Sequence, residues 1–226
     1  MARPIRVLSR AAYRTSIDQD WRPIDHQMNK LVKILKGEPI NGFLDLQVAG
    51  RTRRYTQENA ETLLPVIHFA IAAKLRSETD GNFSLVPVPN KRAVLGVDAF
   101  PTRTSAEAIA AIIGDRASVA PCLRWKALLA KARSGGPRNP DILADNLELS
   151  DLPEGPVVLY DDVLTSGGHI IACSRVLAEA GNMPVLAMTL GWATEMIIPR
   201  PFDWREQILE TEPQEIDWAS FTFDDV

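Results

Sequence analysis

The sequence VVLYDDVLTSGGH, residues 157–169, places two adjacent carboxylates, Asp161 and Asp162, directly after an apolar run. A run without polar alternation is typical of a parallel strand that is covered on both faces. Ligands of open parallel sheets bind beyond the carboxyl ends of the strands, which is where these two side chains are expected. Carboxylates in that place can accept hydrogen bonds from the vicinal hydroxyls of a sugar.

A turn of small residues follows the two aspartates and leads into a helix. Glycine tolerates positive φ and lets the backbone approach a ligand, and the N–H groups at a helix start attract anions. The pattern predicts a site for a phosphate monoester made of Thr165, Ser166, Gly167, Gly168 and His169. The alternative is a plain strand–turn–helix corner. Two acids followed so closely by hydroxyls and glycines favour a ligand, and the sugar and phosphate features together indicate a ribose 5-phosphate.

Strand and helix patterns alternate over residues 83–194, as in a doubly wound parallel sheet. A helix with Ser105 as its N-cap and Gly114 as its stop is predicted after the first of these strands. The chain has 226 residues, of which 46% are hydrophobic, so it can bury a sizeable core. The predicted fold class is α/β, a doubly wound parallel sheet with an added N-terminal α+β extension.

Three parts are expected along the chain. Residues 1–80 form an extension, or hood, packed on the core, residues 81–200 form the core, and residues 201–226 form an acidic C-terminal tail. Within the extension, the pattern predicts a helix at 24–35, a strand that ends near Gly50, and a long helix with Thr56 as N-cap and a kink at Pro65.

The charge is unevenly distributed. The net charge of −4 argues against tight nonspecific binding of duplex nucleic acid. Residues 201–226 hold eight acids and one base, whereas the first 60 residues hold eleven bases and six acids. The densest basic cluster is RTRR at 51–54. A solvated basic face is favoured there, and an anionic acceptor or a nucleic-acid partner stays open.

The two cysteines, Cys122 and Cys173, lie outside any paired motif, so neither a zinc ribbon nor a disulfide framework is expected. The N-terminal residues lack an apolar segment long enough for a secretory signal. No apolar run approaches the roughly 18 residues that a membrane span requires. These features predict a soluble cytoplasmic protein without a membrane partner.

The stretch VVLYDDVLTSGGH resembles the phosphoribosyl pyrophosphate motif of type I phosphoribosyltransferases. LVPVPNKR at 85–92 and RNPDILADN at 138–146 are similar to the ComF-like, competence-associated branch of that superfamily. The resemblance covers residues 83–194, about half of the chain. His169 stands where the family has a small hydroxyl or apolar residue, and the four-cysteine zinc knuckle of many ComF-like proteins is absent.

The resemblance implies an enzyme that transfers ribose 5-phosphate from phosphoribosyl pyrophosphate to a base-like nitrogen acceptor and releases pyrophosphate. It implies a catalytic role for Asp161 and Asp162, which would hold the ribose hydroxyls and, directly or through water, a Mg²⁺ ion. The acceptor is recognised in this superfamily by a variable hood, and the sequence does not identify it. A homodimer is compatible with the resemblance.

Further residues are implied at the positions of two loops and one strand end. The family's pyrophosphate loop corresponds to Asn90, Lys91 and Arg92, with a solvated basic turn as the alternative. Its mobile loop corresponds to 126–142, which offers Lys126, Lys131, Arg133 and Arg138 to neutralise diphosphate charge. For each of these basic side chains, solvated surface is the alternative. Trp192 could stack on a planar base, and a core tryptophan is the alternative.

Two other functions stay open from the sequence. A noncatalytic protein could keep the same pocket and sense a nucleotide or phosphoribosyl pyrophosphate, because binding and catalysis use the same groups. A nucleic-acid interaction module could use the basic N-terminal part, although the net negative charge disfavours it.

Overall fold

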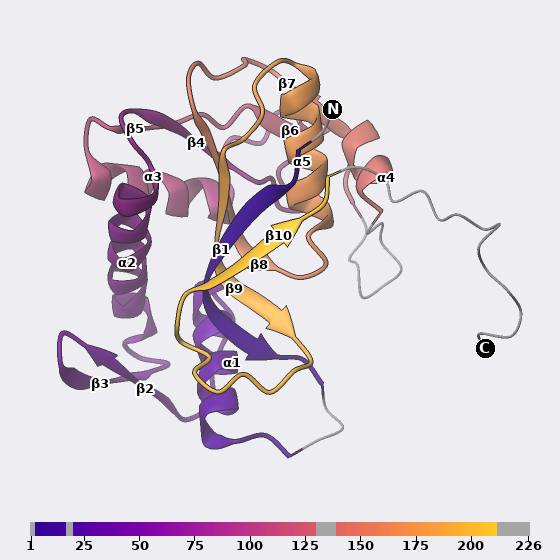
Figure 1. The fold of residues 1–226 in the computed structure, drawn as a ribbon. Coiled ribbons are helices and arrows are strands. Elements are labelled where there is room, and N and C mark those ends of the chain that lie inside the picture. The colour runs from indigo at the N-terminus through magenta and orange to yellow at the C-terminus, as the bar shows by residue number, and fades with distance from the viewer. Residues whose placement is uncertain (1–2, 17–19, 130–138, 212–226) are drawn as a thin grey trace, which may run out of the picture.

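The computed structural model describes residues 3–16, 20–129 and 139–211 (Figure 1). The strands of its main sheet are β1 (Ile5–Arg14), β4 (Phe83–Pro87), β5 (Ala117–Val119), β8 (Val157–Leu164), β9 (Leu186–Thr194) and β10 (Arg205–Leu209). They lie in the order β10, β1, β9, β8, β4, β5. Every neighbouring pair is parallel except β1 with β10. The predicted α/β class is confirmed, and the sheet is mostly rather than wholly parallel.

Three helices cover one face of this sheet. They are α1 (Pro23–Leu35), α2 (Leu63–Glu78) and α3 (Pro101–Ile113). Met28, Ile71 and Ile109 of these helices belong to one apolar cluster, which also contains Tyr160 of β8 and Met188 of β9. Because strand residues with no polar alternation need apolar partners on both sides, the helices bury one side of β8 and β9.

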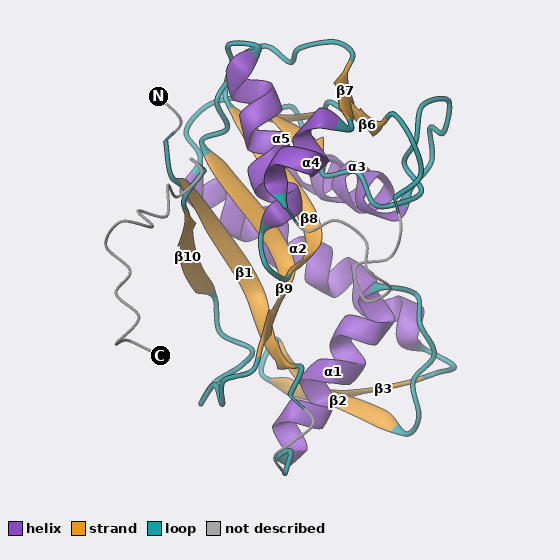
Figure 2. Cartoon of the chain, turned by 90° about the vertical axis from the view of Figure 1, so that its right-hand side faces the viewer, coloured by secondary structure: helices purple, strands orange, loops and turns teal. Residues whose placement is uncertain are grey.

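The opposite face carries α4 (Pro140–Asp145), α5 (Gly168–Glu179) and a small antiparallel sheet of β6 (Leu123–Trp125) and β7 (Leu147–Leu149) (Figure 2). Leu143, Leu147 and Leu177 of these elements join Leu159 of β8 and Ala187 of β9 in a second apolar cluster. The main sheet is therefore covered on both faces, as a doubly wound fold requires.

Strands β4 and β8 are parallel, but the next strand along the chain is added on opposite sides of this pair. Helix α3 leads from β4 to β5 on one side, and α5 leads from β8 to β9 on the other. Ligands of doubly wound sheets bind at such a switch point, outside the carboxyl ends of the strands. The pairing of β4 with β8 ends at Pro87 and Tyr160, while β8 continues to Leu164. Residues 161–164 therefore extend beyond the end of β4.

Two strands of the main sheet are not predicted by the sequence pattern. Strand β1 comes from the N-terminal segment and lies between β9 and β10. Strand β10 lies within the segment expected as an acidic tail, where it forms the antiparallel edge. The remainder of that segment, 212–226, lies outside the described residues.

Two predicted helix starts are wrong. Residues 43–56 form an antiparallel hairpin of β2 (Phe43–Val48) and β3 (Arg51–Thr56), so Thr56 ends a strand. A short 3₁₀ helix, η1 (Ala60–Thr62), precedes α2, and Pro65 falls in the first turn of α2, where a proline is tolerated. Helix α3 begins at Pro101, four residues before the predicted cap Ser105, while the predicted stop at Gly114 is confirmed.

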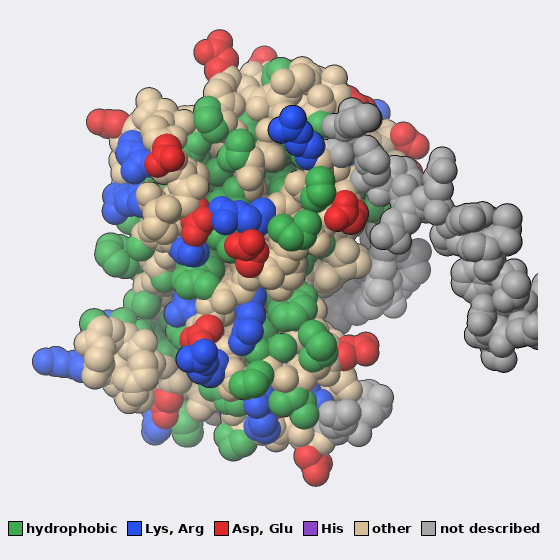
Figure 3. Space-filling model, viewed as in Figure 1, with side chains coloured by type: hydrophobic (Ala, Val, Ile, Leu, Met, Phe, Trp, Pro, Cys, Tyr) green, Lys and Arg blue, Asp and Glu red, His purple; other side chains and the backbone are tan. Residues whose placement is uncertain are grey.

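Acidic and basic side chains are interspersed over the face shown in Figure 3, and a basic side chain projects at the hairpin end, at lower left. In the described part of the chain, no helix combines the length and apolar character that a membrane crossing requires.

Candidate functional site

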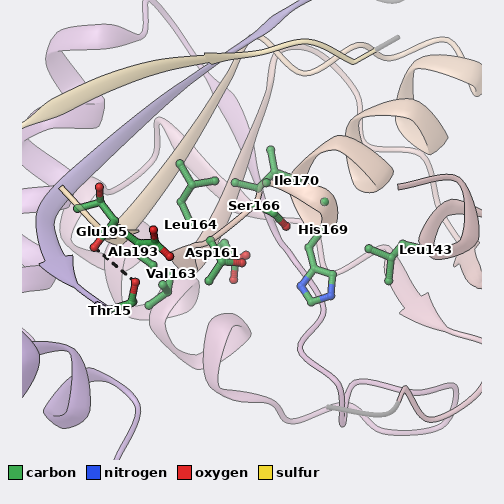
Figure 4. Close-up of a pocket in the computed structure, with 14 residues that line it drawn as sticks. Thr15, Leu143, Asp161, Val163, Leu164, Ser166, His169, Ile170, Ala193 and Glu195 are labelled. Carbon is green, nitrogen blue, oxygen red and sulfur yellow. Dashed lines mark hydrogen bonds between the residues drawn. The ribbon is translucent and has the colours of Figure 1, made fainter. Parts of the chain in front are cut away.

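A cavity of about 530 Å³ lies at the carboxyl ends of β1, β9 and β8 and at the start of α5 (Figure 4). Strand β8 and the following turn supply Asp161 and residues 163–168. The other walls come from Thr15 after β1, residues 193–195 at the end of β9, and, from helices, Leu143, His169 and Ile170. The cavity thus combines the predicted acid with the predicted phosphate turn.

Gly167 determines the shape of this turn. It is the N-cap of α5 and has φ 81° and ψ −4°, a left-handed conformation that favours glycine. A Cβ atom on Gly167 would lie 2.7 Å from Cδ1 of Leu209 on β10. The backbone conformation therefore disfavours larger residues at this position, and an added Cβ would also require the Leu209 side chain or the turn to shift.

The start of α5 offers backbone donors to the cavity. The first N–H groups of a helix have no partner within the helix, and no side chain caps this one. Gly168, His169 and Ile170, the first helical residues, all line the cavity. With the positive end of the helix dipole at the same place, this wall of the cavity is suited to an anion.

Asp161 is the buried acid of the site, with 8% of its surface exposed. Burial raises its pKa well above the ordinary value, and the negative charge of Asp162 raises it further, while Lys36 has a weaker opposite effect. One carboxylate oxygen, Oδ1, accepts a hydrogen bond of 2.8 Å from the backbone N–H of Asp162. A cation or a set of hydroxyl donors in the cavity would favour the ionised form of Asp161.

Asp162 and His169 both follow this acid in the chain, and they differ in how they relate to the cavity. Asp162 is half-buried and is not among the residues that line the cavity. The imidazole of His169 does line it, and Figure 4 shows the ring directed away from the turn. Burial lowers the pKa of His169, and the charge of Asp162 opposes that shift. The ring is therefore neutral over most of the physiological pH range.

The predicted pyrophosphate residues follow β4, next to β8 in the sheet, but do not line the cavity. The side chain of Asn90 accepts a hydrogen bond of 2.9 Å from the backbone N–H of Arg92. Lys91 is half-buried and Arg92 is exposed. Their role in binding a diphosphate stays a prediction.

Of the predicted mobile loop, Lys131, Arg133 and Arg138 lie outside the described residues. Lys126 is described, and its Nζ donates to the backbone carbonyl of Asp145 over 2.8 Å. Trp192 is half-buried, pairs with Leu164 across the sheet and packs on the second apolar cluster, so its predicted stacking on a base stays a prediction.

Sequence patterns miss the wall formed by β1 and β9. The backbone N–H of Thr15 donates to the carbonyl of Thr194 over 3.0 Å and joins the two strand ends. Glu195 adds a second carboxylate at the cavity mouth. The rule that strand ends line such a site, applied to the residues after Trp192, identifies Thr194 and Glu195. Thr15 gives no such signal because its strand is itself not predicted.

The Mg²⁺ ion that the resemblance implies stays a prediction. The described residues contain no group of three or more His, Cys, Asp and Glu arranged for a metal ion. Mg²⁺ is commonly held by one or two carboxylates plus substrate phosphates and water. Asp161 lines the cavity and can supply one carboxylate in that mode, whereas Asp162 does not line it, so its part in holding Mg²⁺ stays a prediction.

The comparison with solved structures gives matches, and the one described below is a weak likeness. No protein-family model matches this chain, and no curated protein matches its sequence. A solved structure, orotate phosphoribosyltransferase from Aeropyrum pernix, is similar with a TM-score of 0.38 and 18% sequence identity, over 73% of this chain and 83% of that chain. A likeness of this size assigns neither family nor activity, so the function is inferred from the residues of the cavity.

Proposed function

We propose that this chain is a phosphoribosyltransferase, which binds phosphoribosyl pyrophosphate and transfers its ribose 5-phosphate to a nitrogen acceptor with release of pyrophosphate. One observation carries the proposal. A single cavity contains both a buried carboxylate, Asp161, and the turn 165–168 at the uncapped start of a helix. These are the two kinds of group that a sugar phosphate needs.

In this proposal the ligand contacts the cavity at two places, the turn at 165–168 and Asp161. The 5-phosphate accepts hydrogen bonds from the backbone of the turn and from the hydroxyls of Thr165 and Ser166. The ribose hydroxyls donate to Asp161, which lines the same cavity. The pyrophosphate extends toward the turn at 90–92, because β4 is the strand next to β8.

The reaction breaks the C1–O bond to pyrophosphate and forms a C1–N bond, while the proton of the acceptor nitrogen passes to the departing pyrophosphate or to water. Positive charge grows on the ribose as this happens. Asp161, ionised by its ligand, stabilises that charge from a buried position where electrostatic interactions are strong. Asp161 and Asp162 would also hold Mg²⁺, which neutralises charge on the departing pyrophosphate. No covalent intermediate on the protein is required.

A second candidate function is a noncatalytic sensor of a nucleotide or of phosphoribosyl pyrophosphate. One observation favours it: no Lys or Arg is among the described residues that line the cavity. Catalysis of pyrophosphate departure benefits from such cations, whereas binding to the backbone turn does not need them. Release of pyrophosphate from the bound donor in the presence of candidate bases separates the two functions.

Calorimetric titration with phosphoribosyl pyrophosphate, with and without Mg²⁺, tests the proposal. We expect Mg²⁺-dependent binding by the wild type and a loss of affinity of about 100-fold in Asp161→Asn, because a charge-assisted contact is removed. Asp115→Asn is the matched control, since Asp115 is exposed and lies before the amino end of β5. A folded wild-type protein that does not bind this ligand refutes the proposal.

A further inference from the structure

Trp125, at the end of β6, is fully buried and does not line the cavity. Its indole Nε1–H donates to two backbone carbonyls of the loop after β4, those of Pro89 at 3.1 Å and Asn90 at 2.9 Å. A buried indole N–H usually finds a partner, but this one is shared between two consecutive peptide groups. The contact fixes the backbone at the beginning of the predicted pyrophosphate turn.

The backbone of Trp125 holds the other end of the same loop. Its N–H donates to the carbonyl of Ala93 over 2.9 Å, and its carbonyl accepts from the N–H of Leu95 over 3.1 Å. Side chain and backbone of one residue therefore fasten the loop 89–95 at both ends. Trp125 is itself held by pairing with Leu147 of β7.

The indole also lies next to His169, at the start of α5. The rings of Trp125 and His169 are tilted at 51° with centroids 5.4 Å apart. His169 lines the cavity at the start of α5. Trp125 also belongs to the apolar cluster that contains Ile170 and Leu164, which flank the turn. One buried side chain thus contacts both the loop after β4 and the first residues of α5, which follow the turn after β8.

We propose that Trp125 is a positioning residue that sets the spacing between these two loops and thereby selects ligands that carry both a 5-phosphate and a diphosphate. This inference rests on the proposed function. A ligand with phosphate groups at both ends must match a fixed distance between two sets of donors, because displacement of one set weakens its contacts. A ligand with one phosphate needs the turn alone and does not depend on that distance.

Trp125→Phe tests the inference, because it keeps an aromatic ring beside His169 and removes the N–H that binds Pro89 and Asn90. We expect the affinity for phosphoribosyl pyrophosphate to fall roughly tenfold, and that for ribose 5-phosphate to change less than about twofold. Trp204→Phe is the control, since Trp204 is half-buried and packs on the other apolar cluster. The inference is overturned if wild type and Trp125→Phe bind each ligand with the same affinity. It is also overturned if Trp125→Phe loses affinity for both ligands to the same extent.

Hydrogen exchange measured on the ligand-free proteins separates failure of this inference from failure of the proposed function. The amides of Ala93 and Leu95 are expected to exchange faster in Trp125→Phe and to be unchanged in Trp204→Phe. If the wild type binds neither ligand, the proposed function fails. Unchanged exchange over 89–95 in Trp125→Phe overturns the positioning role whether or not any ligand binds.

Discussion

Two regions of this molecule could receive an anion, and they are built in opposite ways. The hairpin of β2 and β3 carries the densest run of positive charge, RTRR at 51–54, and all four of these residues are exposed. Arg54 is engaged by Asp45 through two hydrogen bonds of 2.9 and 2.8 Å and lies over the ring of Phe43. The hairpin presents its charge to solvent.

The turn at 165–168 carries no charged side chain. Its donors are backbone N–H groups at the start of α5, and they line a partly open cavity that is also lined by Asp161. Exposed charges are screened by water and salt, whereas fixed dipoles in a partly closed cavity are screened less. The comparison teaches that the proposed phosphate site differs from the hairpin in fixed geometry, not in a higher local density of Lys and Arg.

The largest effect is expected from Gly167→Ala. The added Cβ meets Cδ1 of Leu209 at 2.7 Å in a left-handed backbone, so the Leu209 side chain or the turn must shift. Because the backbone donors of the turn need a fixed geometry, the affinity for phosphoribosyl pyrophosphate should fall about 100-fold. The free energy of unfolding should decrease by roughly 2–4 kcal/mol, from backbone strain and overpacking together. Calorimetry and urea unfolding measure the two effects.

Gly50→Ala in the hairpin is the matched control for that change. Gly50 has φ 76°, close to that of Gly167, but nothing lies within 4 Å of its added Cβ. We expect a loss of stability of about 1 kcal/mol from backbone strain alone and no change in ligand affinity. Comparable loss of binding in both variants would mean that the turn has no special part in the site.

The sequence predicts the turn because its signals are local. The apolar run, the adjacent acids and the glycines lie within thirteen residues, 157–169, and the structure has a strand, a turn and a helix there. The end of β8 is less well predicted: the strand continues to Leu164, because pairing with β9 extends to Trp192. Such pairing is a non-local property that the run of residues does not reveal.

The wall formed by β1 is not predicted for a related reason. The segment IRVLSRAAYR contains three arginines, which interrupt the alternation typical of a strand. In the structure Arg14 is buried with Asp25 of α1 at 3.7 Å, and Arg10 stacks on Phe202. Partners from distant segments make these charges acceptable inside the fold, and the sequence alone does not pair them.

A smaller effect, of opposite sign in the two regions, is expected from removing one acid in each. Asp161 has a pKa raised by burial, so Asp161→Asn should raise the melting temperature at pH 7 by on the order of 3 °C while weakening ligand binding. Asp45 has a pKa lowered by the hydrogen bonds from Arg54, so Asp45→Asn should slightly lower the melting temperature.

The pH dependence of stability follows from the same shift. Below about pH 4, the ordinary pKa of aspartate, the carboxyl of Asp161 is protonated in both folded and unfolded chains. As the pH rises toward the raised pKa of the folded state, the unfolded chain loses its proton first, and the wild type loses stability. Melting temperatures from pH 4 to 8 should therefore diverge, with Asp161→Asn increasingly the more stable. Melting temperatures of the two proteins that stay parallel over this pH range would contradict a raised pKa of Asp161 in the folded state.

The smallest effect is expected from the double change Arg51→Ala/Arg53→Ala in the hairpin. Both side chains are exposed, and their charge is screened, so the free energy of unfolding should change by less than about 0.5 kcal/mol. Affinity for phosphoribosyl pyrophosphate, measured by calorimetry at two salt concentrations, should stay within about twofold of the wild type. A larger loss of affinity that grows at low salt would show that the charge of the hairpin attracts the ligand. The contrast between the turn at 165–168, which depends on geometry, and the hairpin would then no longer hold.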